Sequence, residues 1–131
     1  MAVDFGERRV GIAVTDPGGR FALPLTTLER RSDRQVLSEL VDLARRKEIE
    51  GWVVGEPRHL DGRVGEGAER ARRFATKLEE TTGLPVRMIN ESLTSREAIR
   101  RLRRAGIDPR ERPEKVDQVA AQILLEEALG C

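Results

Sequence analysis

The sequence is poor in the residues that build several common kinds of site. It contains one cysteine, Cys131, and one histidine, His59. An internal disulfide and a structural zinc site of four cysteines, or of two cysteines and two histidines, are excluded, and we expect a reducing, cytoplasmic environment. Aromatic residues make up 3% of the chain. They are Phe5, Phe21, Trp52 and Phe74. Their positions are typical of a core, which argues against a base-stacking platform.

The sequence also lacks long apolar runs and a large net charge of either sign. No run approaches the ~20 apolar residues of a membrane span, and residues 1–6 have neither the basic nor the apolar stretch of a signal peptide, so we expect no membrane association. The 24 basic and 23 acidic side chains leave a formal charge of +1, which indicates no polyanionic partner for the chain as a whole. We expect residues 1–131 to form one domain, given their number.

One segment departs from this charge balance. Of the 24 basic residues, 21 are arginine. Residues 96–112 contain seven of them against three acids, a local charge of +4 (7 − 3). Arginine binds phosphate through a planar, bidentate fork, so this segment is a candidate nucleic-acid contact. The alternatives are a solvated helix face and, for the arginine excess itself, codon bias or a hot habitat.

Hydrophobic periodicity predicts strands first and then alternating helices and strands. Apolar residues alternate over 1–6 and 9–14, and a third apolar run covers 21–28, which indicates an antiparallel meander. Further strands are predicted at 52–55 and 84–89, and helices at 36–44, 71–78, 94–105 and 114–129. This order predicts an α/β fold with a mixed five-stranded sheet, three antiparallel strands plus two parallel ones, flanked by helices.

Three carboxylates lie within or next to segments that are predicted to be buried, where a solvated side chain is not expected. Asp4 lies inside the first predicted strand, Glu91 directly follows the strand that ends near 89, and Asp117 lies in line with the apolar stripe of the last helix. A buried carboxylate needs a proton, a cation or a metal, and for any one of them an arginine partner is the simplest explanation. If the three converge, their hard oxygens would suit Mg²⁺ or Mn²⁺, and two such ions can hydrolyse a phosphodiester.

Small residues accompany the first of these acids. Gly6, Gly11 and Ala13 share the parity of Asp4 and Arg9 in the first two predicted strands. Side chains this small would let a phosphate backbone approach. Gly6 is equally well explained as the start of a tight hairpin.

The sequence resembles the YqgF/RuvX family in four blocks that occur in order along nearly the whole chain. The blocks are Asp4-Phe5-Gly6-x-x-Arg9-Val10-Gly11-Ile12-Ala13-Val14-Thr15-Asp16, Val53-Val54-Gly55-x-Pro57-x-x-x-Asp61-Gly62, Asn90-Glu91-x-Leu93-Thr94-Ser95-x-x-Ala98 and Val116-Asp117-x-x-Ala120-Ala121-x-Ile123-Leu124. The resemblance implies a ribonuclease H-like fold and divalent-metal phosphodiester hydrolysis, with Asp4, Glu91 and Asp117 as catalytic residues and metal ligands. Members of the family are described as pre-16S rRNA nucleases and, formerly, as Holliday junction resolvases.

Several positions depart from the family pattern. Only three residues precede Asp4, where family members carry a longer apolar stretch. Asn90 replaces a common Asp, and Ser92 replaces a common Arg that could contact phosphate. Glu56 stands where an apolar residue is usual and is either a fourth metal ligand or a solvent-facing loop residue. His59 stands where Asn is usual and is either a proton shuttle or merely exposed.

The sequence therefore predicts a cytoplasmic nuclease that uses Mg²⁺ or Mn²⁺ and acts on structured RNA, with precursor ribosomal RNA as the expected substrate. The predicted substrate-binding residues are Gly6, Arg9, Thr94, Arg100, Arg101 and Arg104. Two alternatives stay open, a DNA nuclease that cuts branched junctions and a non-catalytic nucleic-acid-binding protein on the same fold. We expect a monomer or a weak homodimer.

Overall fold

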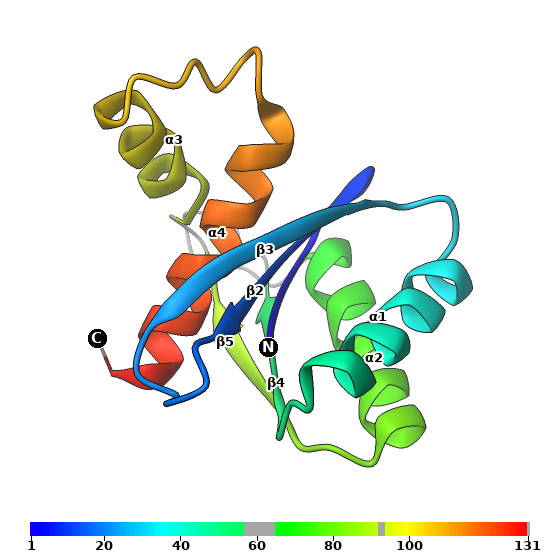
Figure 1. Ribbon diagram of the computed structural model, residues 1–131. Helices are drawn as coiled ribbons and strands as arrows, with labels where there is room; N and C mark the ends of the chain where they lie inside the picture. The colour runs from blue at the N-terminus through cyan, green and yellow to red at the C-terminus, as the bar shows by residue number, and fades with distance from the viewer. Residues whose placement is uncertain (57–64, 92–93, 131) are drawn as a thin grey trace.

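The computed structural model describes residues 1–56, 65–91 and 94–130, and its centre is one five-stranded sheet (Figure 1). The strands are β1 (Ala2–Phe5), β2 (Arg9–Thr15), β3 (Ala22–Glu29), β4 (Trp52–Glu56) and β5 (Val86–Asn90). Their order across the sheet is β3-β2-β1-β4-β5. The β1–β2 and β2–β3 pairs are antiparallel, whereas β1–β4 and β4–β5 are parallel. The predicted fold class, a meander joined to two parallel strands, is confirmed.

Helices cover both faces of the sheet. Side chains alternate between the two faces along each strand, which explains why there are two separate hydrophobic cores. The helices are α1 (Asp33–Lys47), α2 (Glu66–Thr82), α3 (Thr94–Arg104) and α4 (Pro113–Leu129). Figure 1 shows α1 and α2 on one side of the sheet and α4 on the other. In β1, Val3 and Phe5 join the core under α1 and α2, whereas Ala2 joins the core under α4. Because successive strand residues face opposite sides, Asp4 faces α4.

Helix α4 is held on the meander by side chains as well as by apolar packing. The Thr27 hydroxyl on β3 donates to the Glu114 carbonyl oxygen at 2.6 Å, and the Gln122 amide donates to the Ala22 carbonyl oxygen at 2.9 Å. Leu124 and Leu125 are buried against the sheet. These contacts fix α4 across this face of the sheet.

One aromatic residue departs from its predicted environment. Phe5, Trp52 and Phe74 are buried as expected, and the Phe5 and Phe74 rings stack with centroids 4.4 Å apart. Phe21, by contrast, is 66% exposed. It lies in the turn before edge strand β3, where its backbone N–H donates to Asp16 Oδ1, so it belongs to the turn and not to the core.

Among the residues that the structure describes, none of the helices has the length and apolar content needed to cross a membrane.

Candidate active site

The first acidic side chain, Asp4, is delivered by the central strand β1. Asp4 pairs with Gly11 of β2 across the antiparallel register, so both face α4. Burial raises the pKa of the Asp4 carboxyl, and the negative charge of Asp117 raises it further, while a hydrogen bond from Glu91 acts in the opposite direction. Asp4 therefore lies within electrostatic reach of both other predicted carboxylates.

Glu91 reaches this point from the end of β5. Its backbone N–H donates to the carbonyl oxygen of Glu56 at 3.1 Å, which continues the β4–β5 pairing by one residue. The Glu91 carboxyl then lies over Gly55. A Cβ atom at Gly55 would come within 2.6 Å of Glu91 Oε2 and 2.8 Å of Leu124 Cδ1. The glycine in β4 thus makes the space that the Glu91 carboxyl occupies.

Asp4 and Glu91 are hydrogen-bonded to one another and share a proton. Burial, the negative charge of Asp4 and the hydrogen bond to Asp4 together raise the pKa of Glu91 to about 10. At neutral pH the pair therefore keeps at least one proton, which the hydrogen bond between the two carboxyl groups holds. A pair of buried acids that keeps a proton in this way is also a site where a cation could replace that proton.

This shared proton makes the stability of the metal-free protein depend on pH. The folded state favours neutral Glu91, so this contribution to the free energy of unfolding is complete below the unfolded pKa of about 4.5 and is lost as pH rises toward about 10. Glu91→Gln keeps a donor to Asp4 and cannot ionise. We expect its free energy of unfolding, measured by urea denaturation in EDTA, to exceed that of the wild type by a margin that grows from pH 5 to pH 9. A margin that stays constant over this range would contradict the shared proton.

The third carboxylate, Asp117, comes from the first half of α4 and is engaged by an arginine. Arg9 Nε lies 2.6 Å from Asp117 Oδ2 and donates to it. The backbone of α4 at this point is packed directly on Gly11, because a Cβ atom there would overlap the Asp117 carbonyl group and come within 2.9 Å of Asp117 Cβ. Gly11 therefore admits a helix to the sheet, and the space we expected for a phosphate is filled by α4.

The chemistry of these donors fits a divalent cation, although the present side-chain arrangement does not preform its site. Asp4 and Glu91 provide buried hard oxygens whose ionisation is unfavourable without a cation, and Asp117 is close enough to raise the pKa of Asp4. Within residues 1–56, 65–91 and 94–130, no three His, Cys, Asp or Glu side chains stand so that they could hold one ion. The third carboxylate, Asp117, is instead engaged by Arg9 through Oδ2.

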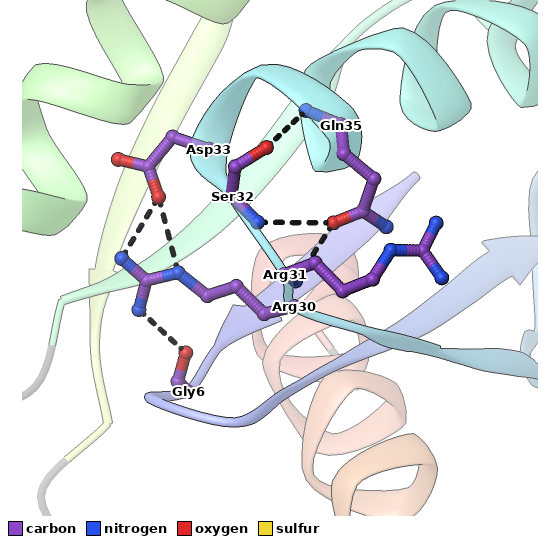
Figure 2. A network of polar contacts seen from close by, with 6 residues as sticks. All are labelled: Gly6, Arg30, Arg31, Ser32, Asp33 and Gln35. Carbon is purple, nitrogen blue, oxygen red and sulfur yellow. Dashed lines mark hydrogen bonds and ion pairs between the residues drawn. The ribbon is translucent and has the colours of Figure 1, made fainter.

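The hairpin that carries Asp4 and Arg9 is held in place by the largely buried side chain of Arg30 (Figure 2). Arg30 Nη1 donates to the Gly6 carbonyl oxygen at 3.0 Å, its guanidinium lies 4.3 Å from the centroid of the Phe5 ring, and its Nε and Nη2 donate to Asp33 Oδ1. Gly6 itself donates its N–H to the Arg9 carbonyl oxygen at 3.1 Å. These contacts give Gly6 the tight-hairpin role, and its predicted contact with substrate stays a prediction.

Thr94 and Glu56 are both bonded to the backbone of Glu91, and their side chains have different partners. Thr94 is buried, and both its hydroxyl and its N–H donate to the Glu91 carbonyl oxygen, at 3.0 and 3.2 Å. Thr94 therefore orients the backbone of Glu91. Glu56 is also buried, which differs from the solvent-facing alternative, and it forms an ion pair with Arg72 of α2. His59 and Ser92 lie outside the described residues.

The arginines of α3 separate into two groups. An open hollow of about 610 Å³ is lined by Arg96, Ile99, Arg100, Arg103 and Arg104. Arg101 lies outside this lining, where its guanidinium binds both carboxylate oxygens of Glu126 on α4 and also contacts Glu97. Of the three α3 arginines predicted to bind substrate, the structure thus places Arg100 and Arg104 in the hollow and Arg101 at the α3–α4 contact.

Comparison with known proteins gives this arrangement a family. The chain matches the RuvX family, described as Holliday junction resolvase, over residues 1–130. The chain belongs to the RuvX family. It is 40% identical over 129 residues to a protein of Syntrophus aciditrophicus named "Putative pre-16S rRNA nuclease", covering 98% of this chain and 86% of that one. It is 41% identical over 126 residues to a protein of the same name from Anaeromyxobacter sp. (strain K), covering 96% and 92%.

Solved structures show how far the RuvX fold extends. The structure of RuvC from Thermus thermophilus is similar with a TM-score of 0.60 at 14% identity, over 98% of this chain and 94% of that one. The same protein in complex with a Holliday junction substrate gives a TM-score of 0.58 at 15% identity. This RuvX-family chain therefore shares the ribonuclease H-like fold of RuvC, as the sequence resemblance implied.

Some residues of the site were not found by sequence reasoning. Gly55 was noted as the end of a buried strand and as part of a family block but was given no role, although a glycine inside a strand is a signal of close approach by another group. Arg30 and Arg72 carried no signal, because each is one of 21 arginines and its partner lies on another element.

Proposed function

We propose that this protein is a divalent-metal-dependent nuclease that hydrolyses phosphodiester bonds in the 5′-end processing of precursor 16S rRNA. The observation that carries the proposal is the buried Asp4–Glu91 pair, with Asp117 in electrostatic reach, on a fold shared with RuvC. Charged groups are costly to bury without a function or a partner. The names of the curated relatives support a nuclease and point to precursor 16S rRNA.

The three carboxylates have distinct parts in this proposal. Mg²⁺ or Mn²⁺ bound by their oxygens would activate a water molecule and stabilise the leaving oxygen of the phosphodiester. Asp4, on the central strand β1, would be one of the ligands. Glu91 would bind the cation in its ionised form, and Thr94 holds the backbone of Glu91 in place. Asp117 joins the other two from α4.

The DNA-junction alternative has its own support. The RuvX family is described as Holliday junction resolvase, and the RuvC of the similar structure was solved with a Holliday junction. Cutting a junction symmetrically requires two active sites, whereas trimming an RNA end requires one. A strictly monomeric protein in solution would therefore weaken the junction alternative.

A direct comparison of substrates tests the proposal. The purified protein is incubated with precursor 16S rRNA and with a four-way DNA junction, at one salt concentration, with Mg²⁺, with Mn²⁺ or with EDTA. We expect metal-dependent cleavage of the RNA and none in EDTA. Cleavage of the junction alone would establish the alternative substrate, and the absence of metal-dependent cleavage of either would favour a non-catalytic nucleic-acid-binding protein.

The α3 hollow predicts how binding of RNA responds to salt. Changing Arg100, Arg103 and Arg104 together to glutamine should reduce the slope of log K against log[salt] by about 2, since each lost phosphate contact removes roughly 0.7 to 0.9. Arg101→Gln is the control on the same helix, because it removes one arginine charge at the contact with Glu126 and none from the hollow, so its slope should change by less than that of the triple variant. Filter binding between 50 and 300 mM salt measures both slopes. Equal slopes for the triple variant and the wild type would make α3 an ordinary solvated face.

A further inference from the structure

The ion pair between Arg9 and Asp117 places a guanidinium group on a carboxylate that is proposed to bind a metal ion. The two side chains come from β2 and α4, 108 residues apart, and their 2.6 Å contact joins Arg9 Nε to Asp117 Oδ2. The Asp117 side chain is 20% exposed and that of Arg9 is 39% exposed. The carboxylate is therefore the more enclosed partner, and the guanidinium approaches it from the solvent side.

Only one of the two partners is free to move away. The backbone of Asp117 is pressed against Gly11, and α4 is fixed to β3 through Thr27 and Gln122. Arg9, at the first position of β2, holds its charge at the end of a long side chain. When Asp117 changes its partner, the guanidinium moves and the carboxylate stays.

We propose that Arg9 is a removable counter-ion, which neutralises Asp117 in the metal-free protein and turns to a substrate phosphate when the metal binds. The inference rests on the proposed function, because it takes Asp117 to be a metal ligand. Arginine and a divalent cation are both attracted to the carboxylate and repel one another, so each weakens the hold of the other. A phosphate satisfies both, because its negative charge can bridge the guanidinium and the metal.

Reciprocal coupling between metal and phosphate follows. A phosphate that draws Arg9 from Asp117 leaves the carboxylate open to the metal, and a metal on Asp117 releases Arg9 toward phosphate. By thermodynamic linkage, each ligand must raise the affinity of the other by the same factor. The site would thus assemble fully only when its substrate is present.

Calorimetric titration of Mn²⁺ into three proteins tests this proposal without measuring cleavage. The proteins are the wild type, Arg9→Gln and Arg8→Gln, whose exposed side chain lies one residue away and loses the same charge. Without phosphate, Arg9→Gln should bind Mn²⁺ about fivefold or more tightly than the wild type, and Arg8→Gln within about twofold of it. Dimethyl phosphate, a single phosphodiester anion, should tighten Mn²⁺ binding to the wild type more than to Arg9→Gln.

The outcomes separate this inference from the proposed function. Equal or weaker Mn²⁺ binding by Arg9→Gln, or equal tightening by Arg8→Gln, would overturn the counter-ion role and leave the nuclease proposal intact. Failure of all three folded proteins to bind Mn²⁺ would overturn the metal dependence and this inference with it. Thermal unfolding of each variant verifies that it is folded.

Discussion

Asp4→Asn is expected to lower the rate of RNA cleavage by about three orders of magnitude or more while leaving the protein folded. Asparagine has nearly the shape of aspartate and can still accept the Glu91 hydrogen bond, but it lacks the charge that binds a divalent cation. Because the variant removes a buried carboxylate, its melting temperature in EDTA should equal or exceed that of the wild type. Loss of cleavage with no loss of stability is the combination that distinguishes a functional acid from a structural one.

The matched control for this prediction is Asp42→Asn. Asp42 lies on the exposed face of α1, so the same chemical change occurs far from the Asp4–Glu91 pair. We expect wild-type cleavage and stability for it. If Asp4→Asn cleaves RNA at the wild-type rate, Asp4 has no part in the mechanism. If it unfolds at a clearly lower temperature, the carboxylate stabilises the fold and the activity loss says little.

Gly11→Ala should have the largest effect on the structure of the site for the smallest change in the sequence. The added methyl group would overlap the backbone carbonyl of Asp117, which cannot turn aside as a side chain could, so α4 must move off β2. Overpacking of this kind costs about 3 kcal/mol of unfolding free energy or more. The same movement takes Asp117 from its position, so cleavage should also fall by about a hundredfold.

Gly51→Ala is the control for Gly11→Ala. A Cβ atom at Gly51 would find its closest neighbour, the Pro85 carbonyl oxygen, at 3.4 Å, which is an ordinary contact. Urea denaturation should therefore give a change below about 1 kcal/mol for this variant and an unchanged cleavage rate. If the loss of stability in Gly11→Ala is as small as in Gly51→Ala, α4 moves away from the added methyl group at little cost.

The candidate site could be predicted in outline because misplaced charge is visible in a sequence. Asp4 inside an apolar strand, Glu91 at a strand end and Asp117 in a helical stripe are departures from local patterns, and the succession of strands and helices along the chain follows from periodicity. The structure places Asp4 and Glu91 in one hydrogen-bonded pair and Asp117 within electrostatic reach of Asp4. Their roles as metal ligands stay a prediction.

The partners of these acids could not be predicted, because they depend on how distant elements pack. Nothing in the sequence distinguishes Arg9 from the other arginines as the partner of Asp117, and the two residues meet only when α4 crosses β2. The same holds for Gly11, whose missing side chain serves a helix instead of a phosphate. Phe21 was misplaced for a local reason, since one residue's difference puts it in the turn and not in the strand.

The position of α3 bears on where a bound strand would be cut. The helix begins at Thr94, three residues after Glu91, and rises about 15 Å over the ten residues to Arg104. A backbone gripped at the far end of α3 would therefore reach the carboxylates after a set length. The cleavage position would then be set by the distance between α3 and the carboxylates and not by the base sequence.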